Sequence, residues 1–392
     1  MSDGALEPQP VAAQPVAPRQ GGIVQPGAAT GSYAAAGVDV VAGERAVELM
    51  KASIAAAQRP EVVGDFGGFA GLFDASALRS YRRPLLATST DGVGTKVAVA
   101  QRMNVHDTIG IDLVAMVVDD LVVCGAEPLF MTDYIATGKV VPERIAAIVR
   151  GIAEGCRQAG CALLGGETAE HPGLLAPDEY DVAGAGTGVV EADALLGAAR
   201  VQSGDVVIAM RSSGLHSNGY SLARHVLLTT SGLGLDLYLD ELGRTLGAEL
   251  LTPTRIYALD CLDLARDSAI DVHAFSHVTG GGLAANIARV LPVHLAADID
   301  RATWAPHAIF DLVGRVGNVP QAELERTFNQ GIGMVAVVAP GSADATLQRL
   351  SDRGVPAWVC GNVRERRDGE HGDAEAKGGA GGAVTLVREH MR

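Results

Sequence analysis

The chain has 392 residues, of which 48% are hydrophobic, and it carries 46 acidic against 31 basic side chains for a formal net charge of −15. A chain this acidic has no long-range attraction for nucleic acid or for an anionic membrane surface, so any phosphate must be bound locally. The length predicts two domains at roughly 150 residues each. No apolar run approaches the ~18 residues that a transmembrane helix needs.

The cysteines and the first residues of the chain indicate in which cellular compartment the protein works. The five cysteines are odd in number and form no CxxC pair, which is typical of buried thiols in a reducing compartment. The first residues lack the basic start and apolar core of a signal peptide. We therefore expect a cytoplasmic protein.

Both ends of the chain differ in composition from the middle. Residues 1–31 consist mainly of Pro, Ala, Gln and Gly, which cannot offset ordering entropy by burial, so we expect a disordered tail. Residues 364–383 are charged and then rich in glycine, and they precede a strand-like run, AVTLV, at 383–387. The composition predicts that 364–392 is mostly a flexible tail.

Between these ends, short apolar runs alternate with longer helical periodicities, which predicts a mixed α/β protein. The expected strands are 83–89, 128–136, 161–165, 180–190, 205–210, 272–278, 294–299, 333–338 and 357–363. The expected helices are 110–125, 142–160, 218–228, 254–267 and 343–354. A crossing near residue 200 predicts an N-terminal domain at 32–198 and a C-terminal domain at 199–363.

The segment TSTDGVGTK (88–96) ends an expected strand with Asp91, Gly92, Gly94, Thr95 and Lys96. Glycines at a strand end let backbone amides approach an anion, and Lys96 would add a positive charge. Asp91 is a natural ligand for magnesium. The spacing matches neither a Walker A loop nor a Rossmann loop. A plain tight turn is an equal alternative for this segment alone.

Two further segments precede or follow this loop. GDFGGFAGLF (64–73), with Gly67 and Gly68, is either a mobile cover for a nucleotide or an ordinary surface loop. In GIDLVAMVVDDLVVCG (110–125), Asp112 lies on the same helix face as Asp119 or Asp120. Buried unpaired carboxylates are costly, and coordinating a cation is one way to relieve that cost.

Three more loops follow expected strands, at the edge where α/β proteins bind ligands. GGETAE (165–170) contains Glu167; SSGLHSNGYS (212–221) contains His216, Ser217 and Asn218 and opens a helix, which favours anion binding. His216 is either structural or able to donate to a phosphate and move a proton. HVTGGG (277–282) repeats the pattern with Thr279, Gly280 and Gly281. Together, the glycine-rich strand ends indicate a ligand with several phosphates.

These motifs, with GAEPLF, DYIATGK, YDVAG, LTPTRIY, RVLP and RTFNQGIGM, closely resemble the phosphoribosylformylglycinamidine cyclo-ligases, the aminoimidazole ribonucleotide synthetases of purine biosynthesis. The match runs in order from Ser32 to about Val363. The resemblance implies a two-domain fold in an ATP-binding superfamily that includes selenophosphate synthetase and thiamine-monophosphate kinase. In that family the N-terminal sheets of two subunits form a barrel-like interface, so a homodimer is expected.

The resemblance also implies a reaction: ATP-dependent closure of an imidazole ring on formylglycinamidine ribonucleotide, through an iminophosphate, with ATP and Mg²⁺ required. By resemblance, His216, Asp120 and Lys51 are the expected catalytic residues, and Asp91 and Asp120 the metal ligands. The residues expected to bind ATP are Lys51, Gly67, Gly68, Asp91, Gly92, Gly94, Thr95, Lys96, Asp120 and Glu167. Those expected to bind the substrate are His216, Ser217, Asn218, Thr279, Gly280 and Gly281.

Two residues depart from the family pattern. Asp119 stands where the family often has Asn, and His171 stands where it often has Met. Asp119 adds a charge to the expected metal face, and His171 adds a titratable group beside Glu170.

Other functions remain as alternatives. Selenophosphate synthetase needs a reactive cysteine in its mobile loop, and residues 64–73 have none. The hydrogenase maturation factor of the superfamily ends in a cysteine, whereas this chain ends EHMR. Thiamine-monophosphate kinase would not explain HSNGY together with FNQGIGM. A catalytically silent, nucleotide-binding scaffold is the alternative from a different class.

Overall fold

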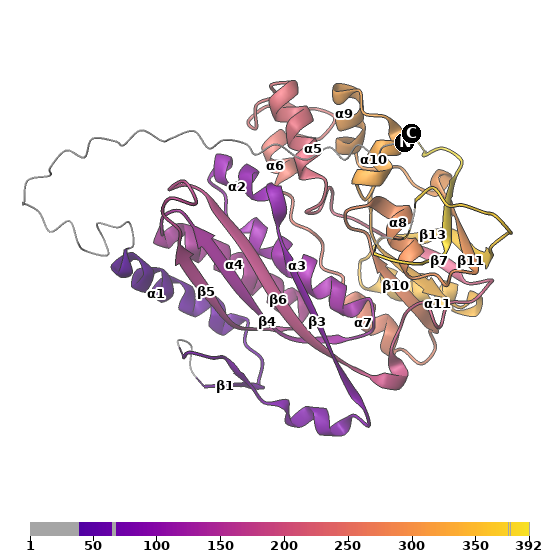
Figure 1. The fold of residues 1–392 in the computed structure, drawn as a ribbon, viewed down its shortest axis with the longest axis horizontal. Coiled ribbons are helices and arrows are strands. Elements are labelled where there is room, and N and C mark those ends of the chain that lie inside the picture. Colours follow the sequence, from indigo (N-terminus) through magenta and orange to yellow (C-terminus); the bar gives the residue numbers. More distant parts are fainter. Residues whose placement is uncertain (1–38, 65–67, 375, 377, 392) are drawn as a thin grey trace, which may run out of the picture.

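A computed structural model describes residues 39–64, 68–374, 376 and 378–391. The tail expected at 1–31 and Gly67 lie outside these residues. The fold is mixed α/β, as predicted, and contains two main sheets. We call residues 39–198 the N-terminal part and residues 199–391 the C-terminal part (Figure 1).

The N-terminal part is built on a four-stranded sheet of order β3-β6-β4-β5, in which only β4 and β5 are parallel. Helices α3 and α4 pack on one face of this sheet, and α1 packs on α4 (Figure 1). The elements are α1 (Val40–Ala56), β1 (Val62–Val63), β2 (Leu72–Phe73), η1 (Ala75–Ser80), β3 (Pro84–Gly92), η2 (Gly94–Lys96), α2 (Val97–Met103), α3 (Thr108–Val122), β4 (Glu127–Thr137), α4 (Pro142–Ala159), β5 (Ala162–Glu170), β6 (Tyr180–Glu191) and η3 (Ala192–Ala194).

The C-terminal part is built on a six-stranded sheet of order β10-β12-β7-β13-β11-β14, antiparallel except for the pair β11 and β14. The elements are β7 (Val206–Arg211), α5 (Tyr220–Arg224), η4 (His225–Thr230), β8 (Tyr238–Leu239), β9 (Arg244–Thr245), α6 (Leu246–Leu250), α7 (Ala258–Arg266), β10 (Val272–His277), α8 (Gly282–Arg289), β11 (Leu295–Asp300), η5 (Arg301–Thr303), α9 (Ala308–Gly317), α10 (Gln321–Thr327), β12 (Ile332–Val338), η6 (Pro340–Ser342), α11 (Ala343–Asp352), β13 (Ala357–Glu365) and β14 (Ala383–Val387).

The two parts share one apolar core. A single cluster of buried side chains joins α3 and α4 with β7, α7 and β12, and a second cluster fills the other face of the six-stranded sheet under α8. Helix α3 is buried along almost its whole length, so any polar residue on it must find its partner inside the protein. In Figure 1 it lies between the four-stranded sheet and the C-terminal part.

Most of the expected strands and helices are confirmed, and one helix begins later than predicted. The sequence predicts a helix over 254–267, but α7 begins only at Ala258. The preceding residues instead give backbone N–H groups to carboxylates of α3. The segment 364–392, for which composition predicts a mostly flexible tail, includes β14, which pairs with β11, and an ion-pair network of Arg364 with Asp298 and Glu370.

Candidate active site

The loop after β3 meets the loop after β7, and we call the second of these loop 212–219. Gly94 has φ +69, which favours glycine, and a Cβ there would lie 4.0 Å from the carbonyl oxygen of Ser217. The hydroxyls of Thr95 and Ser221 lie 3.2 Å apart. Two of the glycine-rich strand ends predicted to act together are therefore neighbours across the boundary between the two parts.

Lys96 is fully buried between these loops. Its ammonium donates to Oδ1 of Asp112 at 2.9 Å and to the carbonyl oxygens of His216 at 3.0 Å and Thr252 at 2.7 Å. Burial lowers its pKa below the ordinary value, while the charge of Asp112 acts in the opposite direction. An ammonium has three N–H donors, and all three are used inside the protein. The assignment of Lys96 to a phosphate stays a prediction, and it would require the ammonium to give up one of these three acceptors.

Asp112 is the buried partner of Lys96, and it also anchors the segment before α7. Its Oδ1 accepts hydrogen bonds from the backbone N–H of Thr254 at 2.7 Å and from the Thr254 hydroxyl at 2.6 Å. The sequence suggests that buried carboxylates on this helix are relieved by a cation. For Asp112 the partners are the ammonium of Lys96 and the amide and hydroxyl of Thr254, and all of them bind Oδ1.

Asp119, one of the two departures from the family pattern, has a similar structural role. Its carboxylate accepts the backbone N–H of Tyr257 at 3.0 and 3.2 Å. Burial raises the pKa of Asp119 to about 7, against the opposing effects of the nearby His277 and of this hydrogen bond. The extra carboxyl group is therefore enclosed beneath the segment 254–257.

Asp120, the next residue, is half-exposed, and its Oδ1 lies 2.9 Å from Nδ1 of His277 at the end of β10. Burial lowers the pKa of His277, but the hydrogen bond that its ring donates to Asp120 and the charges of Asp119, Asp120 and Asp91 outweigh it and raise that pKa above its ordinary value. Asp91 and Asp120, the two predicted metal ligands, thus act electrostatically on one imidazole. Sequence reasoning assigned no role to His277, although it stands directly before the glycine-rich VTGGG segment.

His216 is the buried residue within loop 212–219, and its backbone has φ +62. Its Nε2 accepts the backbone N–H of Ser213 at 3.1 Å, so a neutral ring carries its proton on Nδ1. Burial lowers its pKa well below the ordinary value. The ring packs against Tyr257 and against Gly333, where a Cβ would lie only 2.4 Å from Cε1 of His216. The assignment of His216 as a catalytic residue stays a prediction.

The predicted substrate residues lie on two loops that contact each other. Oδ1 of Asn218 accepts the backbone N–H of Gly280 at 3.0 Å. The hydroxyl of Thr279 donates to Asn286 on α8 at 3.4 Å, and Gly281 caps that helix with φ +103. The loop carrying Ser217 and Asn218 therefore sets the position of the glycines at the start of α8.

Asn329 in the FNQGIGM segment holds loop 212–219 from the other side, and sequence reasoning gave it no role. Its side chain donates to the carbonyl oxygen of Gly214 at 2.9 Å and lies 3.3 Å from the hydroxyl of Ser212. The motif FNQGIGM thus supports the loop.

Lys51, Gly68 and Glu167 lie apart from this cluster. Lys51 is exposed on α1 and pairs with Glu48, and Gly68 is exposed before β2. Glu167 lines a cavity of about 280 Å³ between α1 and β5, whose other walls include Val47, Met50 and Leu163. The backbone register places Asp91 on β3 in line with Gly166 on β5 through β6 and β4. At ~4.8 Å per strand these two positions are about 14 Å apart.

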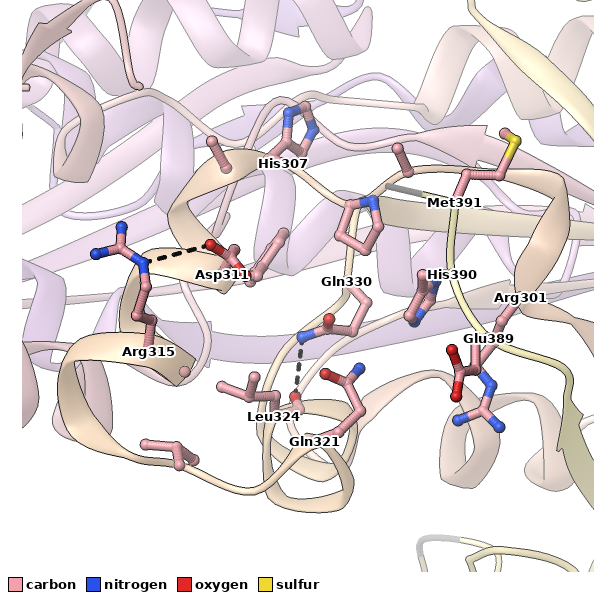
Figure 2. A pocket seen from close by; sticks show the side chains of 16 residues that line it. Arg301, His307, Asp311, Arg315, Gln321, Leu324, Gln330, Glu389, His390 and Met391 are labelled. Atoms are coloured by element: carbon pink, nitrogen blue, oxygen red, sulfur yellow. Dashed lines mark hydrogen bonds and ion pairs between the residues drawn. The ribbon is translucent and has the colours of Figure 1, made fainter. Parts of the chain in front are cut away.

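A larger cavity of about 890 Å³ lies in the C-terminal part, between α9, α10 and the end of the chain. Figure 2 shows His307, Gln330 and His390 along its walls. None of the predicted site residues lines it. His307 nevertheless donates from Nε2 to the carbonyl oxygen of Ser212 at 2.9 Å, so one wall of this cavity contacts loop 212–219.

The described residues contain no group of three or more His, Cys, Asp or Glu side chains arranged to hold a metal ion. The assignment of Asp91 and Asp120 as metal ligands stays a prediction. No helix in the described part of the chain has the length and apolar character needed to span a bilayer.

Family patterns match most of the chain. The pattern described as AIR synthase related protein, N-terminal domain, matches residues 73–190, and that described as AIR synthase related protein, C-terminal domain, matches residues 202–373. The phosphoribosylformylglycinamidine cyclo-ligase of Anaeromyxobacter sp. (strain Fw109-5) is 54% identical, over 85% of this chain and 95% of the relative. That of Brevibacillus brevis (strain 47) is 50% identical over the same shares.

Solved structures share the fold at low identity. Thiamine-monophosphate kinase from Stenotrophomonas maltophilia K279a has a TM-score of 0.61 and 19% identity, covering 87% of this chain and 95% of that one. The hydrogenase maturation protein HypE of E. coli has a TM-score of 0.56 and 20% identity, covering 82% and 90%. A structure of HypE in complex with ATP has a TM-score of 0.55 and 17% identity, covering 83% and 87%.

Proposed function

The chain belongs to the family of phosphoribosylformylglycinamidine cyclo-ligases, and we propose that it performs the reaction for which that family is named. ATP phosphorylates the formyl amide oxygen of formylglycinamidine ribonucleotide to give an iminophosphate. The amidine nitrogen then attacks the activated carbon, and phosphate leaves as the imidazole ring closes. The products are aminoimidazole ribonucleotide, ADP and phosphate.

The observation that carries this proposal is the meeting of three glycine-rich strand ends at one place. The loop after β3 touches loop 212–219 through Gly94 and Ser217, and loop 212–219 binds Gly280 through Asn218. Phosphoryl transfer needs mainly positioning and charge neutralisation. Backbone amides at these loops supply both on a chain whose net charge would repel phosphate.

Asp91 and Asp120 fit a magnesium ion held partly by phosphate oxygens. Magnesium usually binds to one or two carboxylates together with substrate phosphates and water. Asp120 is half-exposed, and Asp91 is near enough to act on the same histidine. The ion would neutralise charge on the triphosphate. Around it, the loop of Gly92, Gly94 and Thr95 would approach the nucleotide, while Ser217, Asn218, Thr279, Gly280 and Gly281 would form the substrate side.

We assign the cavity between α1 and β5 to the base of the nucleotide. Its walls are mainly apolar, with a few polar groups such as Glu167 and Thr168, the usual lining of a small-molecule pocket. With this assignment Glu167 would lie at one end of ATP and the carboxylates of β3 and α3 at the other, and Lys51 would lie on α1 beside the helix face that lines the cavity. Gly67 and Gly68 belong to the loop that would cover the nucleotide.

The open face of the four-stranded sheet supports a homodimer. This face carries Leu86, Thr88, Thr90, Thr132 and Tyr134, and α3 and α4 cover only the opposite face. Leu86 is 64% and Tyr134 41% exposed in the single chain. His171 extends this face through its 3.0 Å contact with Tyr134. A second copy of the sheet, stacked on this face, would bury these side chains and form the barrel-like interface expected for the family.

The decisive experiment follows aminoimidazole ribonucleotide formation by the purified chain with ATP, Mg²⁺ and formylglycinamidine ribonucleotide. We expect ATP turnover that depends on the ribonucleotide. Asp91→Asn should lower kcat by at least 100-fold, and Thr279→Ala should chiefly raise the KM of the ribonucleotide. A chain that binds ATP but shows no turnover would instead be the silent scaffold.

The base assignment has its own pair of variants on α1. Val47→Trp should fill the cavity and raise the KM of ATP about tenfold without changing that of the ribonucleotide. Val41→Trp is the matched control, because Val41 is 74% exposed on the same helix and does not line the cavity. Equal KM values for ATP in both variants would show that the base does not bind in this cavity.

A further inference from the structure

The buried pair of Lys96 and Asp112 binds the backbone of two segments of the C-terminal part. We define the Lys96 cluster as Lys96, Asp112, His216, Thr252 and Thr254. Every acceptor of the lysine other than Asp112 is a backbone carbonyl of the C-terminal part. Asp112 in turn receives both donors of Thr254. One ion pair of the N-terminal part thus fixes two separate segments of the C-terminal part.

The first of these segments is loop 212–219, which the pair holds at its least favourable residue. His216 has φ +62, a conformation that non-glycine residues rarely adopt. Its carbonyl oxygen is bound by Lys96 and its ring by the amide of Ser213. A strained backbone persists only where its surroundings over-determine it, and Lys96 supplies the charged part of that constraint.

The second segment reaches the same loop through a relay of hydroxyls. The hydroxyl of Thr254 donates its hydrogen bond to Asp112. The hydroxyls of Thr254 and Ser217 lie 3.2 Å apart, so in this second hydrogen bond Ser217 must be the donor and Thr254 the acceptor. The hydroxyl of Ser213 donates to the carbonyl oxygen of Pro253 at 2.6 Å. Both ends of the loop are therefore tied to the segment that Asp112 anchors.

The next residue in the loop carries this constraint to the start of α8. Asn218 follows Ser217, and its side chain accepts the amide of Gly280. A change in the backbone at His216 would move Asn218 and release that amide.

We propose that Lys96 and Asp112 are positioning residues: the buried pair holds loop 212–219 so that Ser217, Asn218 and Gly280 keep the geometry that binds the ribonucleotide substrate. This proposal rests on the proposed function for its kinetic consequence. The lysine touches no substrate, because its three donors are already used. The pair also makes the substrate loop depend on contact between the two parts of the chain.

A buried ion pair is a poor device for stability alone, because apolar residues of similar volume often stabilise as well or better. That allows the two roles to be separated by removing both charges together. Lys96→Met with Asp112→Asn leaves no unpaired charge in the interior. We expect this double variant to fold with a Tm within about 5 °C of the parent, and its kcat/KM for the ribonucleotide to fall at least 30-fold. The KM for ATP should change less than threefold.

Three results would overturn the proposal. Unchanged kinetic constants in the double variant would reduce the pair to a stability element. A selective rise in the KM of ATP would indicate that Lys96 binds a phosphate of ATP. A double variant that fails to fold would show that the pair is required for folding itself. Lys139→Met is the control for loss of a lysine charge, since Lys139 is exposed.

A milder series changes only the relay. Thr254→Val removes the hydroxyl between Asp112 and Ser217, and Thr254→Ser retains it. We expect Val to lower kcat/KM for the ribonucleotide about tenfold and Ser to restore it to within a factor of three. Equal activities of the two variants would contradict the relay.

Hydrogen exchange provides a readout that needs no turnover. In the double variant the amides of 213–219 and Gly280 should exchange at least tenfold faster than in the parent, while those of β3 stay unchanged. Unchanged exchange in the loop would refute the positioning role. If the parent chain lacks cyclo-ligase activity but the loop amides respond as described, the proposed function fails and the positioning role stands.

Discussion

The two main sheets of the molecule differ in how many of their faces are covered. Strands β12 and β10 of the six-stranded sheet are buried at every residue, although β10 is an edge strand. In β3 of the four-stranded sheet, exposed and half-buried residues alternate. A strand buried on both sides tolerates no unpaired charge, whereas a strand with alternating exposure packs one face on the core and leaves the other face open to association. The six-stranded sheet is thus covered on both faces, and the four-stranded sheet has one face that is open in the single chain.

The largest expected effect comes from placing the same charge in each sheet. Val335→Arg in β12 should prevent folding, because Val335 is fully buried and an unpaired charge there costs more than about 4 kcal/mol. Circular dichroism and the yield of soluble protein measure this. Leu86→Arg in β3 is the matched variant and should fold. If both variants fold equally well, the contrast between the sheets is wrong.

Glycine substitutions give the next largest contrast. Gly333→Ala in β12 would bring a Cβ to 2.2 Å from the hydroxyl of Tyr257 and 2.4 Å from His216, and should lower the free energy of unfolding by about 1–3 kcal/mol. Gly165→Ala in β5 has no atom within 4 Å of the added Cβ and should be nearly neutral. Urea denaturation compares the two. A neutral Gly333→Ala would mean that the loop carrying His216 can shift freely.

The open face of β3 can be tested through association. Leu86→Arg should weaken self-association at least tenfold, about 1.4 kcal/mol, because the exposed leucine would be buried between two copies. Sedimentation velocity at several concentrations measures this, with Val63→Arg, exposed outside the four-stranded sheet, as the control. A single sedimentation coefficient shared by all three proteins would argue against this face as the interface.

The smallest expected effect concerns the edge of the six-stranded sheet. Arg301 binds both Glu325 and the carbonyl oxygen of Leu386 in β14. Burial alone would raise the pKa of Glu325, but the His390 ring 3.5 Å away and hydrogen bonds from Gln321 and Arg301 outweigh it and lower that pKa to about 2. Since the folded pKa lies below the unfolded value near 4.5, the carboxylate stabilises the fold above pH 4.5, and this stabilisation is lost as the pH falls towards 2.

Glu325→Gln should therefore destabilise the chain by about 1 kcal/mol at pH 7, after allowance for solvent screening. The difference from the parent should shrink between pH 4.5 and pH 3. Urea unfolding at both ends of this range checks the sign. A difference that grows on acidification would mean that Glu325 is not held as a carboxylate by these partners.

Local signals in the sequence predicted local structure well. The helix at 142–160 begins at Pro142 and stops at Gly160, which has φ +69, as the turn chemistry indicates. The strand-like run at 383–387 is β14. These elements follow from residues close together in the chain. The loops after β3, β7 and β10 also meet as the sequence indicated, because these strands end at the boundary between the N-terminal and C-terminal parts.

Long-range pairing is what the sequence did not reveal. Asp112 pairs with Thr254, 142 residues away, and this contact delays the start of α7 until Ala258. Lys96 in TDGVGTK has the pattern of a phosphate ligand, yet its partners lie 16, 120 and 156 residues away. Periodicity and motif spacing carry no information about such partners. The roles of His277 and Asn329 were missed for the same reason.

The sequence separation within the Lys96 cluster has a consequence for the order of folding. Contacts that close loops of more than a hundred residues form late, because the chain must lose the conformational entropy of the loop before the contact can stabilise it. We expect the cluster to be absent from the folding transition state, so that Lys96→Met alone, which leaves Asp112 buried and unpaired, would accelerate unfolding and leave refolding almost unchanged. Lys96 would then govern how long the assembled chain stays folded, independently of how quickly it first reaches that state.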